Sequence, residues 1–233
     1  MIRDEKDIEK LLIATTELLA DYHFEETESA LIQSLETDPD NPEAHYTLGI
    51  IYTRRNEYDK AIKHFLILET GNKESIYLHQ TRTILGYIYA IQGQYVKSKE
   101  SLMKVLDFSK DNTVALSILG YVFYRAKLHE QALRIFDRAL KVQPENAKLL
   151  NNIGYLLIET RINVSKGMEY VKKALRLSPN TPSYLDSLGW GYYQSGNYEK
   201  AVETLKQAFE LAPDSVEIKN HIREIIHLST ENG

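Results

Sequence analysis

The chain has 233 residues, 43% hydrophobic and 26% charged, with a net charge of -5 and no cysteine. This balance gives no electrostatic drive toward nucleic acid or an anionic membrane, and the lack of cysteine excludes disulfides, zinc–thiolate sites, thiol catalysis and a cysteine-linked lipid anchor. No stretch approaches the roughly 18 apolar residues of a spanning helix, and the charged start MIRDEKDIEK lacks the apolar core of a secretory signal. We therefore expect a cytoplasmic protein that neither inserts into a membrane nor binds nucleic acid.

A glycine recurs inside stretches that otherwise have the hydrophobic periodicity of helices. The five glycines lie 37, 34, 34 and 35 residues apart: Gly49, Gly86, Gly120, Gly154 and Gly189. A glycine in a helix costs about 1 kcal/mol relative to alanine, so its recurrence at a fixed period indicates a packing requirement. A period near 34 residues is typical of stacked helix pairs, in which no pair can bury its apolar face alone.

The prolines mark the boundaries between these predicted helix pairs, since none falls inside a periodic segment. The repeats, in chain order, are 8–41, 42–75, 79–112, 113–146, 147–181 and 182–215. The first has Thr15 where the glycine belongs, and extra residues fall near 69–78 and within 161–166. Residues 216–228 predict an amphipathic helix that covers the last repeat, followed by a frayed end at 229–233.

The second helix of each pair carries an apolar stripe that begins with a small residue. In the fourth repeat Ala132, Phe136 and Ala139 follow at i, i+4 and i+7, which is one helix face. We predict that the small residue lets the second helix approach the glycine of the first. Asn41-Pro42 and Thr181-Pro182 predict an N-cap followed by proline at the first helical position.

Several spacings are the same from one repeat to the next. An aromatic residue lies three positions after most of the glycines, and a tyrosine lies at the majority of the turns between the two helices. Residues 119–144 and 188–213 show the pattern most fully. These spacings resemble the tetratricopeptide repeat, a helix-turn-helix unit, over nearly the whole chain. The resemblance implies an all-α fold: a right-handed α-solenoid of about six repeats with a C-terminal capping helix. It also implies a single domain over residues 1–233, with a concave groove lined mainly by first helices.

The positions that face the groove in this family hold many aromatic residues in this chain. The candidate rings are Tyr87, Tyr121, Tyr124, Tyr155, Trp190 and Tyr193. Two interpretations are open for them. The rings either pack on neighbouring first helices and fill the inner curve, or they anchor a bound peptide, because exposed Tyr and Trp are favoured at interfaces. Trp190, the single tryptophan, is slightly preferred as a contact.

Polar candidates flank the rings: Arg125, Lys148, Asn151, Asn152 and Asp186. Asparagine side chains donate and accept hydrogen bonds together, which suits a peptide backbone. Arg125 and Lys148 are suited to pair with an acidic side chain or a C-terminus. For any one of these residues the competing interpretation is a solvated polar rim, which contributes little.

Nothing in the sequence supports catalysis, a cofactor or a metal. The seven histidines lack the spacing of a helical metal site, and the glycines are spread one per repeat rather than clustered around a phosphate. The family's clamp for Hsp70 and Hsp90 C-termini needs a lysine three residues before the glycine position. The residues there are Leu12, Tyr46, Thr83, Ser117, Asn151 and Asp186, so we do not expect an Hsp70 or Hsp90 C-terminus as partner.

The sequence therefore predicts a non-enzymatic interaction module that holds a peptide or partner segment in an aromatic-rich concave groove. The alternative is a structural or assembly scaffold that acts by self-association or within a larger complex. An envelope-associated form of that scaffold requires a signal segment, which these residues do not show.

Overall fold

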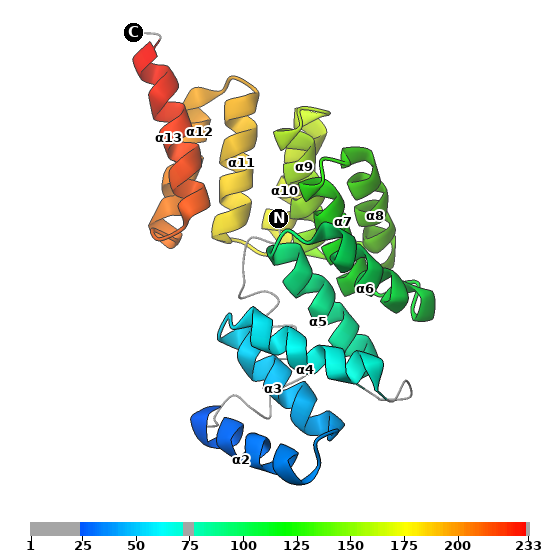
Figure 1. The fold of residues 1–233 in the computed structure, drawn as a ribbon. Coiled ribbons are helices and arrows are strands. Elements are labelled where there is room, and N and C mark those ends of the chain that lie inside the picture. Colours follow the sequence, from blue (N-terminus) through cyan, green and yellow to red (C-terminus); the bar gives the residue numbers. More distant parts are fainter. Residues whose placement is uncertain (1–23, 72–76, 232–233) are drawn as a thin grey trace. The chain divides into compact units, whose positions relative to one another are not determined.

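The computed structural model describes residues 24–71 and 77–231, and every regular element in these ranges is an α-helix (Figure 1). The helices are α2 (Phe24–Thr37), α3 (Pro42–Arg54), α4 (Tyr58–Thr70), α5 (Leu78–Ile91), α6 (Tyr95–Phe108), α7 (Thr113–Arg125), α8 (His129–Val142), α9 (Ala147–Glu159), α10 (Val164–Leu177), α11 (Pro182–Gln194), α12 (Tyr198–Leu211) and α13 (Val216–Glu231). The predicted all-α repeat architecture is confirmed. Most of the predicted first helix of repeat one, with Thr15, lies outside the described residues.

The helices belong to two compact units, and the boundary along the chain falls between Val122 and Phe123. In the N-terminal unit α3 pairs with α4 and α5 with α6, while α2 contacts α3 and α4 contacts α5. In the C-terminal unit α9 pairs with α10 and α11 with α12, and α9 also contacts α8 and α11. Helix α13 packs on α11 and α12, as predicted for the final helix, although it continues as far as Glu231.

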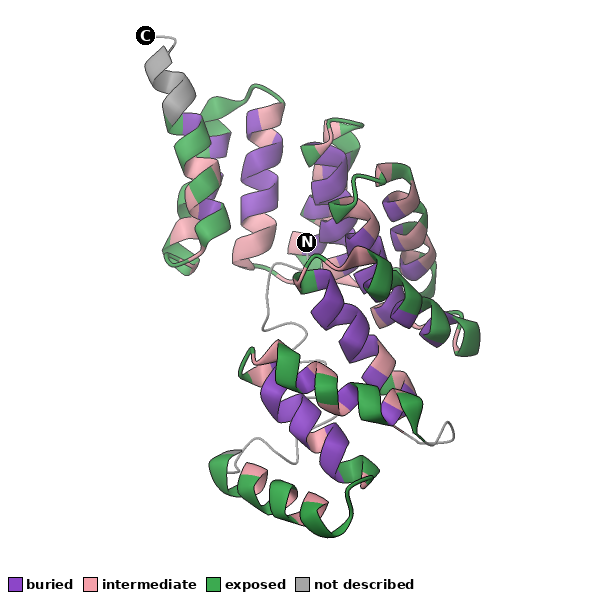
Figure 2. Cartoon of the chain, viewed as in Figure 1, coloured by how far each residue is buried: buried purple, intermediate pink, exposed green. Residues whose placement is uncertain are grey.

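Within each unit the two helices of a pair are buried to different degrees (Figure 2). Helix α9 is buried along most of its length, from Leu149 to Ile158. Helix α8 buries only Ala132, Phe136 and Ala139, which is the predicted stripe. First helices contact elements on several sides, whereas second helices expose one face to water, so the apolar residues of a second helix keep to a single stripe.

The repeated glycines make room for a large side chain of the second helix. A Cβ atom added to the glycine would lie 2.5, 2.6 and 2.7 Å from that side chain in the pairs Gly49–Phe65, Gly86–Leu102 and Gly189–Leu205. The tightest contact is therefore the middle member of each stripe. The prediction that the small first residue of the stripe explains the glycine was therefore incomplete. In the third repeat that residue, Ser98, contacts Gly86 by donating its hydroxyl to the glycine carbonyl.

Helices α9 and α10 approach each other more closely, through two glycines. A Cβ on Gly154 would lie 2.7 Å from the carbonyl oxygen of Gly167, and a Cβ on Gly167 would lie 2.7 Å from that of Gly154. Gly167 occupies the small first position of the stripe in this repeat. Since both clashes involve backbone atoms, no side-chain rotation would relieve them.

The turn within each pair contains a residue with positive φ, seven positions after the glycine. These residues are Asn56, Gly93, Lys127, Arg161 and Gly196. In the fifth repeat the turn is one residue longer, because α9 ends at Glu159 and α10 begins at Val164. The extra residue thus lies in the turn, inside the predicted range 161–166. Lys127 and Arg161 occupy a backbone region that costs a non-glycine residue about 1 kcal/mol.

Asparagines cap several helices. Asn41 accepts a hydrogen bond from the Ala44 amide at 3.0 Å, ahead of a proline in the first turn, as predicted. Thr181 also stands at the N-cap of its helix, but its hydroxyl donates to the Ser178 carbonyl and forms no cap. Asn146, Asn163 and Asn197 cap α9, α10 and α12 in the same way as Asn41.

Two histidines form a hydrogen-bonded pair between α3 and α4. The Nδ1 atoms of His45 and His64 lie 2.8 Å apart, and His45 Nε2 lies 2.8 Å from the Pro39 carbonyl oxygen. A carbonyl only accepts, so His45 carries its proton on Nε2 and its Nδ1 accepts from His64. Burial, together with repulsion from His45, lowers the pKa of His64 to about 4.

We expect Gly154→Ala to lower the free energy of unfolding by about 2 kcal/mol, because the new methyl group meets the Gly167 backbone. Gly86→Ala is the matched comparison, since its methyl group meets only the Leu102 side chain and no backbone atom. Urea unfolding followed by circular dichroism measures both variants. Equal losses for the two variants would contradict backbone contact as the cause.

We expect acid to destabilise the protein through His64. Its native pKa of about 4 lies below the 6.5 of an unfolded histidine, so the unfolded chain binds the proton first. The contribution of His64 to the free energy of unfolding is complete above pH 6.5 and is lost as the pH drops toward 4. The loss should be roughly 1–2 kcal/mol for this partly solvated ring. Melting temperatures at pH 7 and 4.5 should differ less for His64→Gln than for the wild type, with His129→Gln as the control.

Candidate peptide-binding site

Four of the six predicted rings lie in the C-terminal unit and form ring contacts. Tyr124 meets Tyr155 edge-on with centroids 6.4 Å apart, and Trp190 stacks on Tyr193 at 4.8 Å. Tyr87 and Tyr121 belong to the N-terminal unit and are buried there. A ligand surface that includes those two tyrosines stays a prediction.

A residue that the sequence argument did not select, His221 of α13, joins this set. Its ring stacks on Trp190 with centroids 4.4 Å apart and an interplanar angle of 14°, and its centroid lies 6.4 Å from that of Tyr155. Helix α13 begins 34 residues after α11, so the repeat continues into it. Extending the repeat spacing past residue 215 places His221 two residues before the position equivalent to the glycine, which is one of the positions that the resemblance assigns to the groove.

Most of these rings are packed inside the unit. Tyr155, Trp190 and Tyr193 are 5%, 7% and 8% exposed and belong to the core of the unit, whereas Tyr124 is half-buried. The indole Nε1 of Trp190 donates to Glu159 Oε2 at 2.7 Å. The packing interpretation therefore holds for these three rings, and Tyr124 is the ring with the most accessible surface.

Asp186 is a buried residue rather than part of a solvated rim. It is 0% exposed, and its Oδ1 accepts a hydrogen bond from His221 Nδ1 at 2.7 Å. A buried carboxylate is strongly disfavoured without such a partner. This contact therefore ties α13 to α11 and holds the His221 ring against Trp190.

Asn151 and Asn152 are also buried, being 2% and 3% exposed. The side-chain oxygen of Asn151 and both polar side-chain atoms of Asn152 have no hydrogen-bond partner among the described residues. Each unsatisfied group costs about 1–3 kcal/mol, and native proteins contain few of them. These two amides have no partner among the described residues, so a water molecule or a ligand group would have to supply one.

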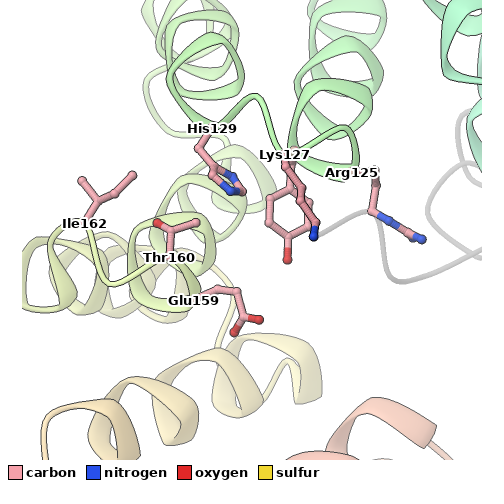
Figure 3. Close-up of a pocket in the computed structure, with 7 residues that line it drawn as sticks. Arg125, Lys127, His129, Glu159, Thr160 and Ile162 are labelled. Atoms are coloured by element: carbon pink, nitrogen blue, oxygen red, sulfur yellow. The ribbon is translucent and has the colours of Figure 1, made fainter.

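A surface hollow of about 510 Å³ lies beside Tyr124, between the ends of α7 and α9 (Figure 3). It is lined by Tyr124, Arg125, Lys127, His129, Glu159, Thr160 and Ile162. Lys148 is eleven residues before Glu159 on α9, about 16 Å along the helix. Arg125 and Lys148 therefore do not act on the same ligand group.

Two further features were searched in the described residues. Within 24–71 and 77–231, no three His, Asp or Glu side chains come together in a way that could hold a metal ion. In the same part of the chain, no helix combines the length and apolarity needed to cross a membrane.

Four family models match the chain, and each is described as a tetratricopeptide repeat. They cover residues 18–79, 79–112, 115–182 and 182–215. A TPR repeat-containing protein of Pseudomonas aeruginosa, PA4667, is 37% identical over 82 residues, which are 35% of this chain and 14% of that protein. The chain spans between 14% and 35% of the length of the curated relatives compared with it.

Solved structures share the fold at low identity. The APC/C hetero-tetramer Cut9-Hcn1 gives a TM-score of 0.72 at 16% identity, covering 92% of this chain and 45% of that one. YrrB, described as a TPR protein with an unusual peptide-binding site, gives 0.58 at 17% identity, covering 83% of this chain and 98% of that one. At such identities the likeness shows the fold alone.

We expect His221→Ala to loosen α13 and to lower the free energy of unfolding by about 2 kcal/mol, because it leaves Asp186 buried without this partner. Hydrogen exchange measured by mass spectrometry should show faster exchange in residues 216–231. Arg223→Ala, on the exposed side of the same helix, is the control and should change neither value. Unchanged exchange in His221→Ala would show that the contact does not hold the helix.

Proposed function

Because the chain belongs to the tetratricopeptide repeat family, we propose that it is a non-enzymatic protein-interaction module that binds a peptide segment along α9 in its C-terminal unit. The observation that carries this proposal is the pair of unsatisfied amides on α9, and Asn152 above all. The name of the Pseudomonas relative states its repeat and no partner, so the partner is inferred from the site.

The chemistry of Asn152 matches a peptide backbone. Its amide offers a donor and an acceptor side by side, and both lack a partner among the described residues. In an extended segment the N–H and C=O of one residue point to the same side, so one residue of a bound strand would bond to both atoms. Asn151 adds a second acceptor one residue earlier on the helix. Forming these bonds would recover the cost of burying unpaired amides.

The aromatic rings have two roles, contact with the ligand and support of the helices. Tyr124 is half-buried and offers its ring to a ligand side chain. Trp190 and Tyr193 are core residues, and the indole nitrogen is already bonded to Glu159. We assign to them the role of a rigid wall that fixes α11 beside α9. Binding energy would then come from amide hydrogen bonds and one or two aromatic contacts, with specificity set at the ends of the segment.

A structural or assembly role is the second candidate. Tyr198 and Val202 on α12 are 59% and 54% exposed, and exposed apolar side chains favour contact with another protein surface. Light scattering over a range of concentrations separates the two functions. A mass that rises with concentration would favour self-association, whereas a constant mass would favour a monomeric adaptor.

We expect Asn152→Leu to affect stability and binding in opposite directions. Leucine removes two unsatisfied polar atoms, so the unliganded protein should gain about 1–2 kcal/mol in unfolding free energy. The same change removes the donor and the acceptor, so peptides selected by the wild type from a random decapeptide display library should bind at least about tenfold more weakly.

Asn220→Leu, an exposed position on α13, is the control for both measurements. It should change neither the urea midpoint nor the anisotropy of labelled peptides. Peptides that bind Asn152→Leu as tightly as the wild type would refute the proposed site.

A further inference from the structure

We propose that the hollow beside Tyr124 binds a carboxylate of the peptide held on α9, so that the protein selects acidic segments. This inference rests on the proposed function and adds the chemistry of the bound segment. The hollow is lined by three basic side chains, Arg125, Lys127 and His129, and by one acidic side chain, Glu159 (Figure 3).

The carboxylate of Glu159 is already engaged. Its Oε2 accepts the Trp190 indole N–H at 2.7 Å, which fixes the side chain toward α11. Lys127 is exposed, and no ion pair joins it to another described side chain. His129 Nδ1 is buried without a hydrogen-bond partner in the described part of the chain. The hollow therefore presents one lysine charge that no described side chain pairs with.

The charge of the surrounding sequence agrees with this assignment. Residues 123–182 contain eleven Lys or Arg and five Asp or Glu, although the whole chain has a net charge of -5. The basic excess is thus concentrated in the segment that forms α8, α9 and α10. A local positive field of this kind attracts an acidic segment before contact and favours it afterwards.

The backbone of Lys127 suits a replacement by glycine. Its φ is 60°, in the region that favours glycine, and glycine does occupy the same turn position in the third and sixth repeats as Gly93 and Gly196. The corresponding Arg161 also has positive φ, but its Nε donates to Gln194 within the protein at 2.6 Å. The Lys127 backbone N–H donates to the Tyr124 carbonyl at 2.9 Å within the turn, whereas its side chain forms no hydrogen bond or ion pair with a described residue.

The hollow adjoins the proposed peptide site. Tyr124 lines the hollow, meets Tyr155 of α9 edge-on, and lies with its ring centroid 6.0 Å from that of His129. A segment bonded to the amides of α9 and lying over Tyr124 would therefore reach Lys127 with one of its side chains or with its C-terminus.

The test uses two fluorescein-labelled octapeptides, one alternating aspartate with serine and the other alternating asparagine with serine. The wild type should bind the acidic peptide more tightly. Lys127→Gly should weaken acidic binding about fivefold, the effect of one well-formed exposed ion pair, and leave neutral binding unchanged. Because glycine suits a positive φ, the variant should also melt at a slightly higher temperature, so lost binding would not reflect unfolding.

Arg161→Gly is the matched control, since it removes the same charge from the same turn position outside the hollow. It should keep the preference for the acidic peptide. Equal affinity of the wild type for both peptides, a preference that survives Lys127→Gly, or one that Arg161→Gly abolishes equally would overturn the assignment.

Asn152→Leu, measured with the same peptides, separates this inference from the proposed function. If Asn152→Leu binds both peptides more weakly while the wild type shows no preference for the acidic one, the amide site is supported and the carboxylate site is refuted. If the preference depends on Lys127 but Asn152→Leu binds normally, the hollow stands and the amide site fails.

Discussion

The contact on which the rest of the structure depends is the close approach of the two helices in the pairs α3–α4, α5–α6, α9–α10 and α11–α12. A glycine in the first helix receives a large side chain of the second, as between Gly86 and Leu102, and at Gly154 and Gly167 the two backbones nearly touch. Because a side chain at the glycine would separate the helices, this one position sets the distance at which the apolar stripe of the second helix meets the first. The burial of α9 and the placement of Asn151 and Asn152 on it follow from that distance.

The architecture could be predicted from the sequence because it rests on spacing. The period of the glycines, the stripe at i, i+4 and i+7, and prolines such as Pro42 that begin helices are all one-dimensional patterns with a local physical cause. The spacing also predicted the range that contains the extra residue of the fifth repeat. Packing holds the helices at similar lengths, so the turn takes up the added residue. The role of the small stripe residue was only partly predicted, because spacing does not say which of two neighbouring side chains fills the gap left by a glycine.

The candidate site was harder to predict because it depends on which polar groups satisfy each other. Spacing alone could not tell that Trp190 bonds to Glu159, or that the carboxylate of Asp186 is buried against His221 from the final helix. Tertiary pairing of this kind turns an expected rim residue into a core residue. The three-dimensional structure also identifies the polar groups that lack a partner. The unpaired side-chain atoms of Asn152 can be recognised only when the hydrogen bonds of its neighbours are known. The register of the repeat placed six aromatic residues at groove positions, but burial of Tyr155 and Tyr193 leaves Tyr124 as the more accessible ring.

The contact between Gly154 and Gly167 has a consequence for molecular recognition. With backbone against backbone, α9 has little freedom to rotate or slide on α10, and the burial of Asn151 and Asn152 restricts the rotation of their side chains. The donor and acceptor of Asn152 are held in a fixed direction whether or not a ligand is present. The surface is therefore preorganised, and nearly all the conformational entropy lost on association belongs to the bound segment. A stiff segment that is already extended should on this ground associate more tightly than a flexible one of the same composition.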